Sequence, residues 1–505
     1  MVKNASKDTI FPFNRAGGIL LHPTSLPSEF GIGDLGTNAF LFIDFLKKNN
    51  LRVWQILPLG PTGYGNSPYQ CFSAFAGNPY LISTEQLIKQ FKLQQDFKTL
   101  NGFDSKKVDY EKVISYKMEF LRTFYTSSFR KLNFEKNQDY IDFKSKNSFW
   151  LDDFALFMSI KEHFGMKSWL DWDPDFKLRD QITISSWSVE HAITIEFHKF
   201  IQFIFFSQWK ELKLYAKKND ISIIGDIPIY VSLDSSDVWS NQDLFLLDNG
   251  EPTVVAGVPP DFFSKTGQLW GNPIYNWTKM KKNGFKWWIN RITQMLELVD
   301  IIRLDHFRGF EAYWEVPGED KTAENGKWVK APGKYLFETL KKKFNPLPLI
   351  AEDLGVITPE VNKLRHEFSF PGMKILQMAF GDHNFVENRF LPHNIERNSV
   401  SYTGTHDNLP ICAWWENSSE LTKENTLKYF NSSEQDIITN LIRAVWSSRS
   451  VLAIIPMQDL LRLGEKSRMN FPGTLSNNWE WRFQWIEVEE SYLKELVSFT
   501  KLFER

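Results

Sequence analysis

The chain has 505 residues and a mass of 59.2 kDa, with a formal net charge of −2 and 24% charged residues. This near-neutral balance gives no electrostatic reason to expect nucleic acid or an anionic membrane as a partner. The two cysteines, Cys71 and Cys412, lie far apart without metal-ligand spacing, which argues against a disulfide framework or a structural zinc site. No apolar run approaches the roughly 18 residues of a membrane span, and the start of the chain has no apolar core of signal-peptide length. We therefore expect a cytoplasmic protein.

Strand-length apolar runs that end in polar or turn residues recur along the chain. Eight such runs, most of them separated by segments of helical length, are the number that a (β/α)₈ barrel requires. The sequence therefore predicts an α/β fold in which residues 1–505 form a single catalytic (β/α)₈ TIM-barrel domain, without a separate C-terminal β-domain. The runs are 17–22, 53–60, 221–230, 299–307, 347–355, 373–381, 400–408 and 451–459.

Two insertions interrupt this pattern. The region between the second and third runs is too long for a loop and contains helical stretches such as 150–165 and 191–217, so we expect an inserted helical subdomain at 85–210. After the third strand, residues 257–273 combine turn residues with apolar side chains. We interpret this segment as a lid loop at the catalytic edge.

Three acidic residues each follow a short apolar run, namely Asp305 in VDIIRLDHFRG, Glu352 in PLIAEDLG and Asp407 in VSYTGTHDN. In a parallel α/β protein the carboxyl ends of the strands carry the chemistry. Two carboxylates and a helper from three strand ends are the groups needed to cleave a glycosidic bond. Capping of the following helices is the alternative for each acid taken alone.

Arg303 and Asp305 lie two residues apart on one predicted strand, so their side chains point the same way. The guanidinium would keep Asp305 ionised, as a nucleophile requires. A purely structural ion pair is the alternative.

Glu352 follows the apolar residues Leu349, Ile350 and Ala351, and partial burial near other carboxylates would raise its pKa. A carboxyl group of this kind suits a general acid that later acts as a base. Asp353 is the competing candidate, but strand alternation would turn it to the other face.

Two other motifs could be mistaken for a metal site or a nucleotide-binding site. His406 and Asp407, with His306 and Asp305, could in principle bind a metal ion, but adjacent residues on a strand diverge and no i, i+4 pairing supports this, so we expect no metal. Residues 31–36 match GxGxxG, but they follow Pro27 and a polar turn instead of a strand. We interpret them as a glycine-rich turn and expect no nucleotide and no other cofactor.

The segment PTGYGNSPYQCFSAFAGNPY, residues 61–80, places glycines, prolines and tyrosines at the end of the second predicted strand. It is either a long turn with an apolar anchor or an aromatic platform for a sugar ring. Its place on the catalytic edge favours the platform.

These segments, from LLHPTSLPSEFGIGDLG near the start to RMNFPGTLSNNWEWR at 468–482, strongly resemble the 4-α-glucanotransferase family, also called amylomaltase or disproportionating enzyme. The resemblance covers nearly the whole chain, with least of it in 85–210. It implies a retaining α-amylase-like barrel with Asp305 as nucleophile, Glu352 as acid/base and Asp407 as transition-state stabiliser. It also implies a set of substrate-binding residues: Asp226, Arg303 and His406 around the cleaved glucose, Tyr69, Gln268 and Trp270 as further contacts, and Tyr64 in a second glucan site.

The chain departs from the family pattern at two places. Phe262 stands where the family has a tyrosine, which puts a hydroxyl contact in doubt. Leu409, Pro410 and Ile411 replace the usual polar residues after THDN.

We therefore expect an enzyme that transfers α-1,4-glucan segments between maltooligosaccharides, glycogen or starch chains. The alternatives are a hydrolase on the same barrel and an inactive glucan-binding protein.

Overall fold

The computed structural model describes residues 11, 15–91, 102–260, 264–381 and 385–505. Its centre is a closed barrel of eight parallel strands, which confirms the predicted fold class. Around the barrel the strand order is β1-β14-β13-β12-β11-β8-β3-β2. The strands are β1 (Ala16–Leu20), β2 (Val53–Gln55), β3 (Ser222–Pro228), β8 (Ile301–Asp305), β11 (Leu349–Ala351), β12 (Gly372–Ile375), β13 (Ser399–Tyr402) and β14 (Leu452–Pro456).

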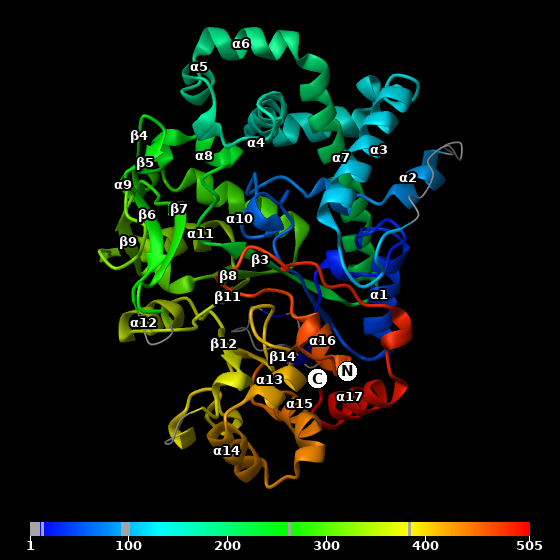
Figure 1. Cartoon of the computed structure of the whole chain (residues 1–505), viewed down its shortest axis with the longest axis vertical. Helices are drawn as coiled ribbons and strands as arrows, with labels where there is room; N and C mark the ends of the chain where they lie inside the picture. The colour runs from blue at the N-terminus through cyan, green and yellow to red at the C-terminus, as the bar shows by residue number, and fades with distance from the viewer. Residues whose placement is uncertain (1–10, 12–14, 92–101, 261–263, 382–384) are drawn as a thin grey trace.

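Helices between these strands pack around the outside of the barrel, as Figure 1 shows. Their buried faces and the strands form one apolar core, because each amphipathic helix must cover its apolar stripe. The longer ones are α1 (Thr37–Lys48), α10 (Lys286–Leu298), α11 (Gly333–Lys343), α12 (Pro359–Glu367), α14 (Glu420–Phe430), α15 (Ile437–Ser447) and α17 (Glu490–Leu502). The shorter ones are α8 (Ser236–Ser240), α9 (Trp277–Lys282), α13 (Ile411–Asn417) and α16 (Met457–Leu460).

Most of the described residues from α2 to β3 are helical and rise above the barrel in Figure 1. This region comprises α2 (Thr84–Phe91), α3 (Tyr110–Ser128), α4 (Gln138–His163), α5 (Pro174–Lys177), α6 (Gln181–Glu190) and α7 (Ala192–Lys218). Helix α7 leads directly into β3, so the last helix of the insertion also serves as the barrel helix before that strand.

Two glutamines of α7 bind the segment that follows β2. The Gln202 side chain accepts from the Gly77 N–H at 2.7 Å and donates to the Gly77 carbonyl at 2.9 Å. Gln208 bonds the N–H and the carbonyl of Ser83 in the same way, at 2.7 and 3.2 Å. All four groups are buried, so these amides satisfy backbone groups that water cannot reach.

A second sheet lies beside the barrel, with the antiparallel order β10-β9-β6-β7. Its strands are β6 (Val254–Val258), β7 (Gln268–Pro273), β9 (Ala312–Pro317) and β10 (Lys327–Lys330), and a two-stranded ribbon, β4 (Leu247–Asp248) with β5 (Glu251–Pro252), precedes it. The expected loop at 257–273 therefore consists in large part of paired strands. Strand β7 pairs with β6, and β6 pairs in turn with β9 from a distant part of the sequence. The role of residues 257–273 as a lid stays a prediction.

Within the described residues, the part of the chain after β14 contains helices and turns but no strand. Among those same residues, we find no helix that is both long and apolar enough to cross a membrane.

Candidate active site

The carboxyl ends of β3 and β8 place three charged groups side by side. Asp226 is the register partner of Arg303, and Arg303 lies two residues before Asp305 on β8. The Arg303 Nη1 donates to both oxygens of Asp226, at 2.8 and 2.6 Å, and lies 2.8 Å from Oδ1 of Asp305. Burial opposes the charge on Arg303, but the two neighbouring carboxylates raise its pKa well above the usual value. The predicted pairing of Arg303 with Asp305 is thus present in the structure.

The two carboxylates differ in access. The Asp305 side chain is 30% exposed at the strand end, whereas that of Asp226 is completely buried. Asp305 is therefore accessible to a bound molecule, whereas the buried Asp226 fixes the position of the Arg303 guanidinium. The direct substrate contact expected of Asp226 stays a prediction.

Glu352 follows β11 directly and is held by two backbone donors. The N–H of His306 donates to its Oε2 at 2.8 Å, and the N–H of Leu354 donates to its Oε1 at 3.0 Å. His306 has a φ of 52°, a left-handed conformation uncommon outside glycine, and follows the last residue of β8. Burial and the Asp305 charge raise the pKa of Glu352 to about 8, against the opposing effects of Arg303 and the two N–H bonds.

Asp353 lies on the other face of the chain, as strand alternation predicts. Its Oδ1 accepts from the Met373 N–H at 2.7 Å, and its Oδ2 lies 3.3 Å from Nε of Arg365. A Cβ at Gly372 would lie 2.4 Å from this carboxylate, so only glycine leaves room for it. Asp353 thus ties β11 to β12 and does not join the cluster around Asp305.

Asp407 is held from the segment that follows β14. Its Oδ1 accepts from the Asn470 amide at 2.6 Å, its Oδ2 lies 3.2 Å from Nε2 of His406, and its backbone carbonyl accepts from Arg468 at 2.6 Å. Burial alone would raise the pKa of Asp407, but His406 and the Asn470 hydrogen bond lower it on balance. The Asp407 carboxylate therefore stays charged and fixed in direction.

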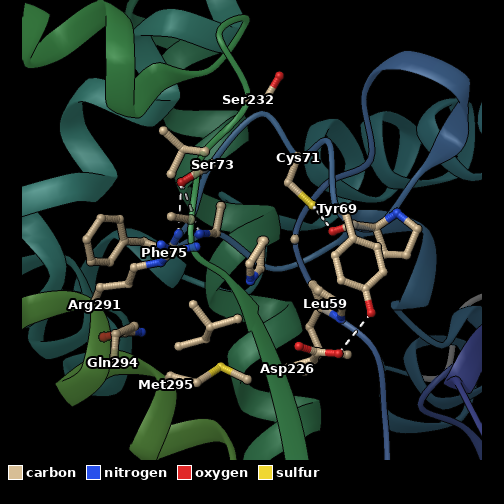
Figure 2. A pocket seen from close by; sticks show the side chains of 18 of the residues that line it. Leu59, Tyr69, Cys71, Ser73, Phe75, Asp226, Ser232, Arg291, Gln294 and Met295 are labelled. Atoms are coloured by element: carbon tan, nitrogen blue, oxygen red, sulfur yellow. Dashed lines mark hydrogen bonds between the residues drawn. The ribbon is translucent and has the colours of Figure 1, made fainter. Parts of the chain in front are cut away.

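An aromatic group joins Asp407 to β3. Tyr69 stacks on His406 with ring centroids 5.3 Å apart, and Trp479 lies 5.9 Å from each of these rings. The Tyr69 hydroxyl donates to Asp226 at 2.8 Å, a bond visible in Figure 2. The segment 61–80 therefore contributes an aromatic side chain to the cluster, as the platform interpretation requires.

Trp270 approaches the same cluster from β7. Its ring lies 4.7 Å from that of His306 in an edge-to-face arrangement, and its Nε1 donates to the Gln268 side chain at 3.2 Å. Tyr64, by contrast, is 71% exposed on a separate turn, and in the described part of the chain it does not hydrogen-bond to or stack with the carboxylate cluster.

The two departures from the family pattern have different outcomes. Phe262 lies outside the described residues. After Asp407, the Leu409 carbonyl accepts from Gln377 at 2.8 Å, and the Ile411 N–H donates to Asp459 at 2.7 Å where α13 begins. Backbone groups hold this loop, so the apolar side chains do not leave it unsupported.

Sequence reasoning did not assign a role to Asn470, Arg468 or Trp479. All three lie in the segment RMNFPGTLSNNWEWR, which contributed to the resemblance to the family but to no residue-level prediction. The signal that could have found them is the dense run of amide and aromatic residues soon after the last barrel strand.

In the described part of the chain, no group of three or more His, Cys, Asp or Glu side chains is arranged to hold a metal ion.

The closed parallel barrel, with carboxylates gathered at the carboxyl ends of its strands, has the architecture of the barrel enzymes, which place their active sites at this edge. Residues 21–488 match the family described as 4-alpha-glucanotransferase, and the chain belongs to that family. It is 48% identical over 494 residues to the 4-alpha-glucanotransferase of Synechocystis sp., covering 95% of this chain and 97% of that protein. It is 48% identical over 493 residues to the one of Aquifex aeolicus, covering 97% and 98%. The structure superimposes on an amylomaltase from Streptococcus agalactiae in complex with acarbose with a TM-score of 0.92 and 40% identity, covering 97% and 99% of the two chains.

Proposed function

We propose that this enzyme transfers α-1,4-glucan segments from one maltooligosaccharide, glycogen or starch chain to another with retention of configuration. The observation that carries the proposal is the pair formed by Asp305, ion-paired with Arg303, and Glu352, which keeps its proton near neutral pH. A retaining mechanism needs one carboxylate that attacks and one carboxylic acid that protonates the leaving group.

In the first step the Asp305 carboxylate attacks the anomeric carbon of the donor. The bond from that carbon to the 4-oxygen of the departing glucan breaks, and Glu352 gives its proton to this oxygen. A glycosyl ester on Asp305 and a Glu352 carboxylate result.

In the second step the Glu352 carboxylate takes the proton of an acceptor 4-hydroxyl, and the acceptor oxygen attacks the anomeric carbon. The ester bond breaks and Asp305 leaves as a carboxylate, so both residues return to their starting states. Asp407, charged and held by His406 and Asn470, would bind ring hydroxyls and stabilise positive charge on the sugar. No step in this scheme draws on a cofactor.

Incubation of the pure protein with maltotriose, followed by separation of the products, tests the proposal. Transfer gives free glucose and a ladder of longer oligomers. Glucose and maltose alone would indicate a hydrolase, and an unchanged substrate would indicate a glucan-binding protein. A cytoplasmic location stays a prediction from the sequence.

A further inference from the structure

A groove of about 310 Å³ lies between helix α4 of the insertion and helices α8, α9 and α10. Its volume is in the range of small-molecule sites, which measure roughly 300–1,000 Å³. Of the described residues that line it, none is one of the three carboxylates Asp305, Glu352 and Asp407.

Four aromatic side chains line this groove. Phe149 at its rim is 48% exposed, although it is large and apolar. Phe75 meets Phe149 and Trp287 edge to face, with ring centroids 5.5 and 5.8 Å away, and stacks on Trp150 at 6.4 Å. Such ring faces pack well against the C–H faces of a sugar.

The polar lining carries charges of both signs. Lys279 is ion-paired with Asp243 at the edge, and Lys286, Asn283 and Asn290 supply further donors and acceptors. Asp237 also lines the groove, so two acidic and two basic side chains balance, the amides are neutral, and the groove offers no net attraction for an ion. Its chemistry suits an uncharged ligand with many hydroxyl groups.

Trp287 presents an unsatisfied hydrogen-bond donor. Its indole Nε1–H is buried and finds no hydrogen-bond partner among the described residues, whereas the Nε1–H of Trp150 donates to Asn147 at 3.1 Å. A buried donor without an acceptor is costly, and a bound hydroxyl oxygen would satisfy it after a small shift of the ring.

From these observations we propose that the groove between α4 and α10 is a second binding site for a neutral oligosaccharide, specifically a glucan chain. The choice of a glucan rests on the proposed function. The groove also borders the segment that carries Tyr69. The Ala74 N–H donates to Asp237 of α8 at 2.7 Å, and Phe75 and Ser73, labelled in Figure 2, line both the groove and the pocket beside Asp226. A chain bound there would rest on the same segment that presents Tyr69 to the active site.

Equilibrium dialysis with labelled maltohexaose tests the site. The Asp305→Asn protein prevents turnover during the measurement, and Phe149→Ala with Asn290→Ala is added to it. We expect the added substitutions to reduce binding by one equivalent of maltohexaose per chain. Lys286→Ala, which removes an exposed side chain, provides a second variant and should weaken that equivalent by about threefold or more.

Ile141→Ala is the matched control, since Ile141 is 40% exposed on the same helix α4 but does not line the groove. Binding curves of the groove variants that coincide with that of the control would overturn the proposal. The maltotriose assay separates the two hypotheses, because absence of transfer by the unmodified enzyme would reject the proposed function while the dialysis result still decides the groove.

Discussion

One nitrogen of Arg303 contacts both Asp226 and Asp305, and this sharing decides which carboxylate can react. Asp226 is fully buried and bonded by Arg303 and Tyr69, so its lone pairs are engaged. Asp305 has one oxygen on Arg303 and remains partly exposed. The arrangement pairs the Asp305 carboxylate with a cation and still leaves it accessible to a bound molecule.

Asp305→Asn is expected to lower transfer from maltotriose by more than about a thousandfold, which corresponds to roughly 4 kcal/mol of transition-state stabilisation. The amide cannot form the ester, yet it is nearly isosteric, so folding and maltohexaose binding should persist. Initial rates measured beside Asp248→Asn, which alters an exposed aspartate in β4, provide the comparison. Transfer above a thousandth of the normal rate would rule out Asp305 as the nucleophile.

The pH dependence should follow Glu352, whose pKa is raised to about 8. The first step needs the protonated form, which predominates below that pH and is lost above it. We expect kcat/KM for maltotriose to be level near neutral pH and to fall about tenfold per unit above about 8. With a glucosyl fluoride donor, whose leaving group needs no proton, this decline should be absent from the first step.

Glu352→Gln should separate the two steps of the same reaction. The fluoride donor can still form the ester, but no base is left to activate the acceptor, so the glycosyl enzyme should accumulate and be visible by intact mass. Equal slowing with the fluoride and with maltotriose would assign the acid/base role elsewhere, and Asp353→Asn is the variant to compare.

The sequence predicted the three carboxylates proposed as catalytic better than the residues that hold them in place. Asp305, Glu352 and Asp407 each end an apolar run, which is a local pattern. Asn470 and Trp479 reach Asp407 and Tyr69 from beyond the last barrel strand, and a contact between such distant segments leaves no periodic signal. Asp353 shows the limit of this local pattern. It follows the same apolar run as Glu352, and only the alternation of side chains along a strand distinguishes the two acids.

At the scale of elements, the second sheet is the main feature that sequence reasoning missed. The barrel strands are recognisable in the sequence as apolar runs between helices. Strand β7, QLWGNP, instead contains glycine, proline and polar residues, and β6, VVAGV, leads into the turn residues that favoured a loop. Strand β6 pairs with β9, which follows β8 in the chain, and β7 completes the sheet by pairing with β6. Trp270 is therefore presented by a paired strand and not by a free loop.

Trp270→Ala tests whether this strand limits the attack of water on the Asp305 ester. The indole packs against His306, next to Asp305, so its removal should open the site to water. We expect the ratio of released reducing ends to transferred segments to rise at least threefold at fixed maltotriose concentration. Leu269→Ala, which changes the adjacent and 37% exposed side chain, is the control. A constant ratio with both rates reduced would limit Trp270 to substrate binding.

At the scale of the whole molecule, helix α7 joins the insertion to the barrel through Gln202 and Gln208. Gln202→Ala would leave the N–H and the carbonyl of Gly77 buried without partners. Since each unmade bond costs about 1–3 kcal/mol, we expect the two lost bonds to lower the free energy of unfolding by about 2–6 kcal/mol in urea denaturation. Gln181→Ala, at an exposed position of α6, should change it by less than about 0.5 kcal/mol. A similar small change for both variants would contradict the role of Gln202.

The paired amides of α7 also bear on how this protein can be shortened. Residues 85–210 look like a removable module, because the described part of this segment consists mainly of helices between two barrel strands. Deletion of these residues would remove Gln202 and Gln208. The N–H and carbonyl groups of Gly77 and Ser83, which follow Tyr69 in the chain, would then lose their hydrogen-bond partners. The insertion therefore stabilises the segment that carries Tyr69. A shortened protein would need four replacement hydrogen bonds to hold this segment in place.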